Sequence, residues 1–168
     1  MKKLFLLFVT VFLTILLFTG CKWLFPPETP TLPLETQTGE HTFGCYIDGE
    51  LFLKNNKPIF LGDWLGARYV STDDGLIYPK GIKIWCEGRN GKVIEMFFNN
   101  FTIGSDIVMD KVSYAGVENC DVSYVHLTKL DTINRIISGR FEFNLIDSVN
   151  NKTVRFTEGR FDIRNMSK

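Results

Sequence analysis

Three acidic residues near the C-terminus are the side chains of this chain most able to carry out chemistry. Glu142, Glu158 and Asp162 fall within one short stretch of the sequence, and glycoside hydrolysis requires two carboxyl groups about 5–10 Å apart. Glu142 and Asp162, however, alternate with Arg140 and Arg160. Such alternation on the outer face of a sheet is explained by cross-strand ion pairs. We therefore expect no enzymatic activity, with glycan hydrolysis through surface carboxylates as the alternative.

The two histidines, His41 and His126, are the remaining candidates for acid–base catalysis or metal binding. Neither lies in an H-x-x-x-H or D-x-D-x-D pattern, the spacings at which metal ligands cluster. The chain also lacks a nucleophile elbow, a G-x-G-x-x-G fingerprint after a strand and a phosphate-binding loop. We expect both histidines to be polar residues facing solvent, and we expect no catalytic group, metal or cofactor.

Aromatic residues indicate a different class of function, the binding of a ligand. Trp64, Tyr69, Tyr78 and Trp85 fall on predicted loops or on the side of a strand opposite its apolar residues. Aromatic rings stack on sugars and are frequent in protein interfaces. They can equally well cover the outer side of a sheet without binding anything. The sequence thus leaves open a binding module with a protein or glycan partner, and also a structural subunit of a larger complex.

The elements that must position these residues are β-strands. Asp48-Gly49, Asp73-Asp74-Gly75 and Gly88-Arg89-Asn90-Gly91 each separate two runs of alternating apolar residues, which is typical of hairpins. No window longer than about ten residues keeps the period of a helix. About eight or nine short strands over residues 41–168 predict an all-β domain, an antiparallel β-sandwich or alternatively a small β-barrel.

The last hairpin can be placed in register from its apolar pattern. Phe141, Phe143 and Leu145 share one side of their strand, and Val154 and Phe156 share one side of the next. Both sets reach the same face of the sheet if Phe143 pairs with Phe156. This pairing leaves a loop of common hairpin length between the two strands, at residues 148–151.

The apolar residues change parity further along the last strand, where Phe161 and Ile163 are odd-numbered. One extra residue near Glu158-Gly159 would produce the change, so we predict a β-bulge there, with a positive φ at Gly159. Gly139 lies where the parity is constant. Its replacement by valine should therefore cost less stability than that of Gly159, unless another strand crosses closely there.

The first residues have the pattern of a secretion signal. Lys2-Lys3 precede an uncharged apolar run from Leu4 to Phe18, and Thr19-Gly20 lead into Cys21. As a helix the run would span roughly 22 Å, which is short of the ~30 Å hydrocarbon core of a bilayer. The pattern resembles the lipobox of bacterial lipoproteins, whose cysteine carries lipid and becomes the new N-terminus. We expect residues 1–20 to be a signal peptide and Cys21 to be the site of lipid attachment.

Residues 21–40 are expected to be a tether between the lipid and the domain. They are rich in proline and threonine, and prolines at this density favour extended chain. Lys22, rather than aspartate, follows the cysteine, so retention in the inner membrane is not signalled. The resemblance to lipoproteins implies that acidic residues soon after the cysteine would mark export to the cell surface. Residues 22–25 contain none, so we favour the periplasmic side of the outer membrane over the cell surface.

Charge and cysteine content restrict the partners and the covalent links. The chain has 19 basic and 19 acidic residues, and loss of Lys2 and Lys3 with the signal leaves 17 against 19, a net charge of −2. Such a chain lacks the excess of positive charge that binding to nucleic acid requires. Among the cysteines, Cys45 alternates with inward apolar residues, so a disulfide, if one forms, should join Cys86 and Cys120.

Both ends of the domain carry recognisable motifs. Gln37-Thr38-Gly39 lead to Thr42-Phe43-Gly44-Cys45, and the C-terminal part contains Ile137–Phe143 ("ISGRFEF") and Thr157–Asp162 ("TEGRFD"). These motifs resemble a family of exported lipoproteins of unknown function that is common in Bacteroidetes. The resemblance implies a Gram-negative envelope and an all-β domain, but no activity. We therefore expect an outer-membrane, lipid-anchored, non-catalytic protein, either a binding or an envelope-accessory module, or alternatively a structural subunit of an envelope complex.

Overall fold

The computed structural model describes residues 2–3, 29–57, 64–70, 80–118, 123–147 and 150–167. The chain divides into two compact units, Met1–Thr31 and Leu32–Lys168. Cys21 lies outside the described residues. Among those described, no helix has both the length and the apolar character needed to cross a bilayer.

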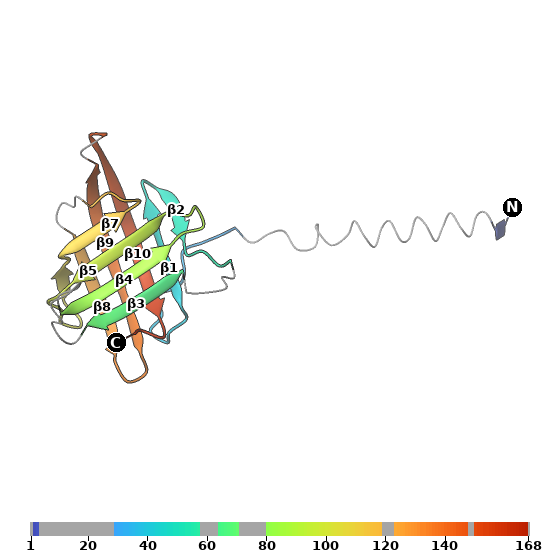
Figure 1. Cartoon of the computed structure of the whole chain (residues 1–168). Helices are drawn as coiled ribbons and strands as arrows, with labels where there is room; N and C mark the ends of the chain where they lie inside the picture. The colour runs from blue at the N-terminus through green and yellow to red at the C-terminus, as the bar shows by residue number, and fades with distance from the viewer. Residues whose placement is uncertain are drawn as a thin grey trace. The chain divides into compact units, whose positions relative to one another are not determined.

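The second unit is an all-β fold of two antiparallel sheets (Figure 1). The first sheet has the order β2-β1-β10-β9-β8-β6 and the second the order β3-β4-β5-β7. In the described part of the chain these sheets do not close into a barrel, and the predicted β-sandwich is confirmed. The strands are β1 (Thr42–Ile47), β2 (Glu50–Leu53), β3 (Leu65–Val70), β4 (Gly81–Glu87), β5 (Val93–Phe98), β6 (Asp106–Val108), β7 (Lys111–Tyr114), β8 (Tyr124–Asp131), β9 (Ile136–Asp147) and β10 (Lys152–Ile163).

The core lies between the two sheets, whose strands cross at an angle in Figure 1. Residues along each strand point alternately to the core and away from it, so Ile82, Ile84 and Cys86 on β4 are fully buried while Trp85 between them is not. Aromatic residues fill the centre of the core. The rings of Phe143 and Phe156, for example, stack with centroids 4.2 Å apart.

The predicted register of the C-terminal hairpin is confirmed. Phe143 pairs with Phe156 and Leu145 with Val154. Strand β9 ends at Asp147 and β10 begins at Lys152, so residues 148–151 connect the two strands as expected. The apolar pattern suffices here because the register is local and one face of both strands is buried.

The predicted β-bulge is also present, but its backbone differs from the expectation. The register between β9 and β10 shifts between Phe156 and Gly159. The residue with positive φ is Glu158, at 52°, and not Gly159. The extra residue turns Phe161 to the buried side, where it is only 3% exposed. Gly159 is needed for a different reason, the close approach of an aromatic ring described in the Discussion.

The compact unit begins earlier than His41, the expected start of the domain. Residues 32–40, which we call the strap, pack on the outer face of the first sheet instead of belonging to a free tether. A Cβ atom at Gly44 of β1 would lie 2.7 Å from Cδ of Pro33, and Nη1 of Arg160 on β10 donates to the carbonyl oxygen of Pro33 at 3.3 Å. The strap therefore crosses β1 and β10 in contact with both.

Candidate functional site

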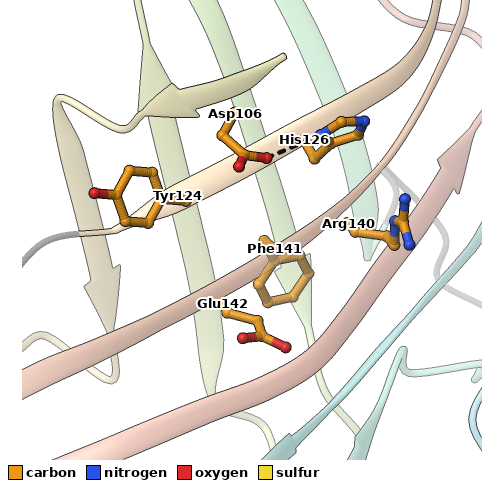
Figure 2. A pocket seen from close by; sticks show the side chains of 6 residues that line it. All are labelled: Asp106, Tyr124, His126, Arg140, Phe141 and Glu142. Carbon is orange, nitrogen blue, oxygen red and sulfur yellow. Dashed lines mark hydrogen bonds and ion pairs between the residues drawn. The ribbon is translucent and has the colours of Figure 1, made fainter. Parts of the chain in front are cut away.

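A hollow of about 320 Å³ lies on the outer face of the first sheet, over β6, β8 and β9 (Figure 2). Its walls are polar except for one exposed tyrosine ring, and its floor includes a residue whose ring is buried in the core. The lining residues are Asp106, Tyr124, His126, Arg140, Phe141 and Glu142.

Strand register brings the lining side chains together. His126 of β8 pairs with Asp106 of β6 on one side and with Arg140 of β9 on the other. Tyr124 pairs with Glu142 in the next outward row. Because outward positions recur every second residue, these side chains all stand on one face of the sheet. The floor residue, Phe141, points the other way.

The hydrogen bond between Asp106 and His126 orients the imidazole ring (Figure 2). Nδ1 of His126 lies 2.9 Å from Oδ1 of Asp106. A carboxylate acceptor at Nδ1 favours the tautomer protonated there, so Nε2 of the neutral ring is an acceptor. The side chain of Asp106 is 73% exposed, and a pair this open to water contributes little to stability.

Arg140 connects the hollow to the strap. Its Nε lies 3.8 Å from Oε2 of Glu35, and both side chains are about half exposed. An ion pair of this length and exposure is weak. The guanidinium group can therefore turn to a ligand in the hollow at little cost.

The charges of the hollow nearly cancel. Asp106 and Glu142 are acidic and Arg140 is basic, so the sum is −1 with a neutral His126 and zero with a protonated one. Tyr124 adds a ring that is 47% exposed. Such a site has donors, acceptors and an aromatic surface, and it selects neither a strong anion nor a strong cation.

The other candidate carboxylates of the sequence do not line the hollow. Asp162 is only 1% exposed, and its two oxygens accept hydrogen bonds from Oγ1 of Thr36 at 2.6 Å, Oγ of Ser138 at 2.7 Å and the main-chain NH groups of Gly39 and Glu40. Burial by itself raises the pKa of Asp162, but these hydrogen bonds outweigh it and hold the pKa below its usual value. This carboxylate fastens the strap to the sheet.

Glu158 is exposed beside the bulge, where its Oε2 lies 3.7 Å from Nη2 of Arg160. Of the three acids named from the sequence, only Glu142 is in the hollow. His41 precedes β1 with a φ of 60° and is likewise absent from the lining.

The aromatic residues suggested by the sequence lie elsewhere in the described structure. Nε1 of Trp64 donates to the carbonyl oxygen of Lys57, and the ring of Tyr69 meets that of Phe101 edge to face at 6.1 Å. Trp85 lies over Gly66 on the outer side of the second sheet. Its indole ring is so close that a Cβ atom at Gly66 would be 2.2 Å from it. Tyr78 lies outside the described residues. Trp64, Tyr69 and Trp85 are not brought together with the hollow.

The cysteines of the core are structural. Cys45 is fully buried, as its alternation with apolar residues predicts, and burial raises the pKa of its thiol to about 12. Cys86 is also buried. Its predicted partner, Cys120, lies outside the described residues, so the disulfide stays a prediction.

Comparison with known proteins does not assign this chain to a family. The chain matches no family model, no curated protein and no solved structure. In the part of the chain that the structure describes, no three His, Cys, Asp or Glu side chains are grouped as a metal ion would need.

Proposed function

We propose that this protein is an exported, lipid-anchored and non-catalytic binding module, whose β-sandwich holds a neutral, hydroxyl-rich ligand of the saccharide class in the hollow over β6, β8 and β9. The observation that carries the proposal is the composition of that hollow. An exposed aromatic ring, Tyr124, stands beside balanced donors and acceptors on a rigid sheet.

The groups of the hollow suit a sugar in chemical detail. The apolar face of a sugar ring can stack on Tyr124. Its hydroxyl groups both donate and accept, so Asp106 and Glu142 can accept from them and Arg140 can donate to them. At about 320 Å³ the hollow is at the low end of ligand sites, which suits a short part of a glycan rather than a long chain.

Non-catalytic binding is favoured over hydrolysis by the state of the acids. Asp162 is engaged by the strap and by Ser138, so it offers no free carboxylate. Asp106 is highly exposed, and its Oδ1 already forms a hydrogen bond with His126.

Binding can be tested with envelope polysaccharides and their oligosaccharides presented to the full lipidated chain. We expect Tyr124→Ala to weaken binding about tenfold or more, because the aromatic ring on which the sugar stacks is lost. Tyr124→Phe, which keeps the ring, should weaken binding much less. The matched control is Ile133→Ala, which removes an exposed apolar side chain in the β8–β9 turn. Equal affinity for Tyr124→Ala and Ile133→Ala would refute the site, and release of shortened glycans would establish hydrolysis instead.

The location is proposed from Cys21 and its surroundings: outer membrane, periplasmic side. A palmitate analogue fed to the producing bacterium should label the wild type and leave Cys21→Ser unlabelled, because the thiol is the expected attachment atom. Cys45→Ser, which removes a buried thiol, is the control and should remain labelled. Modification of the wild type by a membrane-impermeant reagent on intact cells would place the domain at the cell surface.

A further inference from the structure

A second hollow, of about 290 Å³, opens at one end of the sandwich between its two sheets. We call it the end cup. The β9–β10 hairpin, which extends past the neighbouring strands in Figure 1, forms one wall, and the β1–β2 hairpin, the β4–β5 turn and the end of β7 form the others. The lining residues are Ile47, Asp48, Glu50, Leu51, Phe52, Asn90, Lys92, Tyr114, Lys152 and Val154.

The floor of the end cup is apolar and fixed in place by the core. Phe52 and Tyr114 are 4% and 9% exposed, and their rings meet edge to face with centroids 6.4 Å apart. Tyr114 also packs against Phe156 at 5.2 Å. Phe52 and Tyr114 both line the cup, but most of the surface of their side chains is covered by the core.

One cation stands over this floor. Nζ of Lys92 lies 5.4 Å from the centroid of the Tyr114 ring, and no carboxylate of the described residues forms an ion pair with it. The second lysine of the cup is already neutralised, because Nζ of Lys152 lies 3.1 Å from Oδ2 of Asp48. Asp48 is further held by the main-chain NH of Arg155 at 2.9 Å.

The remaining charge at the cup is Glu50. It is exposed, and it shares the side of β2 on which Phe52 faces the cup. Glu50 therefore opposes the entry of an anion, whereas Lys92 attracts one. Removing the charge of Glu50 should therefore raise the affinity of the cup for an anion, and removing the charge of Lys92 should lower it.

From this arrangement we propose that the end cup binds a small amphipathic carboxylate, with the apolar body of the ligand on Phe52 and Tyr114 and its carboxylate on the ammonium group of Lys92. The proposal concerns a site separate from the hollow over β6, β8 and β9, and it does not depend on the function proposed for that hollow.

A diazirine-bearing benzoate is a suitable probe, used with the full chain in non-ionic detergent and read out by mass spectrometry after photolysis. We expect saturable cross-links at the residues of the end cup. Lys92→Gln should lower the affinity about tenfold or more, since a hydrogen bond to a charged group is lost. Glu50→Gln should raise the affinity several-fold, since a like charge is removed.

The matched control is Lys111→Gln on β7, an exposed lysine whose partner is Glu118 at 3.0 Å; it should leave labelling unchanged. The amide analogue of the probe, which lacks the charge, should compete at least tenfold less well than the carboxylate. Equal labelling of Lys92→Gln and Lys111→Gln, weaker binding in Glu50→Gln, or equal competition by the neutral amide would each overturn the proposal.

Discussion

Replacement of Asp162 by alanine is expected to destabilise the sandwich by about 3–5 kcal/mol and to free the strap. A hydrogen bond to a charged group contributes roughly 1.5–3 kcal/mol, and a buried donor left without an acceptor costs about 1–3 kcal/mol. Asp162 accepts from Thr36, Ser138 and the main chain of residues 38–40. The total is less than the sum of these terms, because the donors of the strap regain water when the strap detaches.

Urea unfolding measures the loss of stability, and limited proteolysis within residues 32–40 measures release of the strap. Asp131→Ala is the matched control. Asp131 also accepts main-chain hydrogen bonds, from Ile133 and Asn134, but it does so in an exposed turn, so we expect only a small effect. If the strap of Asp162→Ala resists the protease as well as that of the wild type, other contacts hold the strap in place.

The same carboxylate makes stability depend on pH. Burial raises the pKa of Asp162, the hydrogen bonds lower it more, and the net pKa lies below the ordinary value of 3.8. Its stabilising contribution is therefore complete above about pH 4 and is lost as the pH falls through the lowered pKa. Asp162→Asn should flatten the acid limb of the stability curve below about pH 4. Some slope remains, because the pKa of Asp48 is also lowered.

The strap shows why the sequence predicts some contacts and not others. Proline density in residues 21–40 is a local signal of extended chain, and the strap is indeed without strands. The partner that holds it, Asp162, lies more than a hundred residues away. Alternation of Asp162 with arginines suggested an exposed position, and nothing local reveals that another segment covers it.

The candidate site differs from the C-terminal hairpin in the same respect. The hairpin joins neighbouring segments, so its register followed from apolar parity alone. The hollow depends on β6, a strand of only 3 residues that pairs with β8 and not with the next strand, β7. The sequence identified His126 and Glu142 as outward residues, but it contained no sign that Asp106 and Tyr124 would join them.

The two Gly-Arg-Phe repeats pair with each other across β9 and β10. Gly139 is opposite Phe161, and Gly159 is opposite Phe141, so each glycine is covered by the phenylalanine of the other repeat. The rings of Phe141 and Phe161 lie nearly parallel, 6.4 Å apart. In both repeats, therefore, the absence of a side chain at the glycine leaves space for the phenylalanine ring of the facing strand.

Valine at either glycine is expected to lower stability by about 3 kcal/mol or more, because overpacking in a well-filled core forces both rings and backbone to move. A Cβ atom at Gly159 would lie 2.4 Å from Cε2 of Phe141, and one at Gly139 would lie 2.5 Å from the carbonyl oxygen of His126 and 2.8 Å from Cζ of Phe161. A ring can tilt, but a carbonyl within a paired strand cannot. Gly139→Val should thus be the more harmful, which reverses the order expected from parity, since β8 passes closely there.

Thermal melts of the two valine variants test this order. Thr157→Val, an exposed substitution on the same strand β10, is the control and should change the melting temperature little. A smaller loss for Gly139→Val than for Gly159→Val would mean that β8 yields more readily than the stacked aromatic rings. In that case the rigidity of this sheet comes from packing of its core and not from strand pairing.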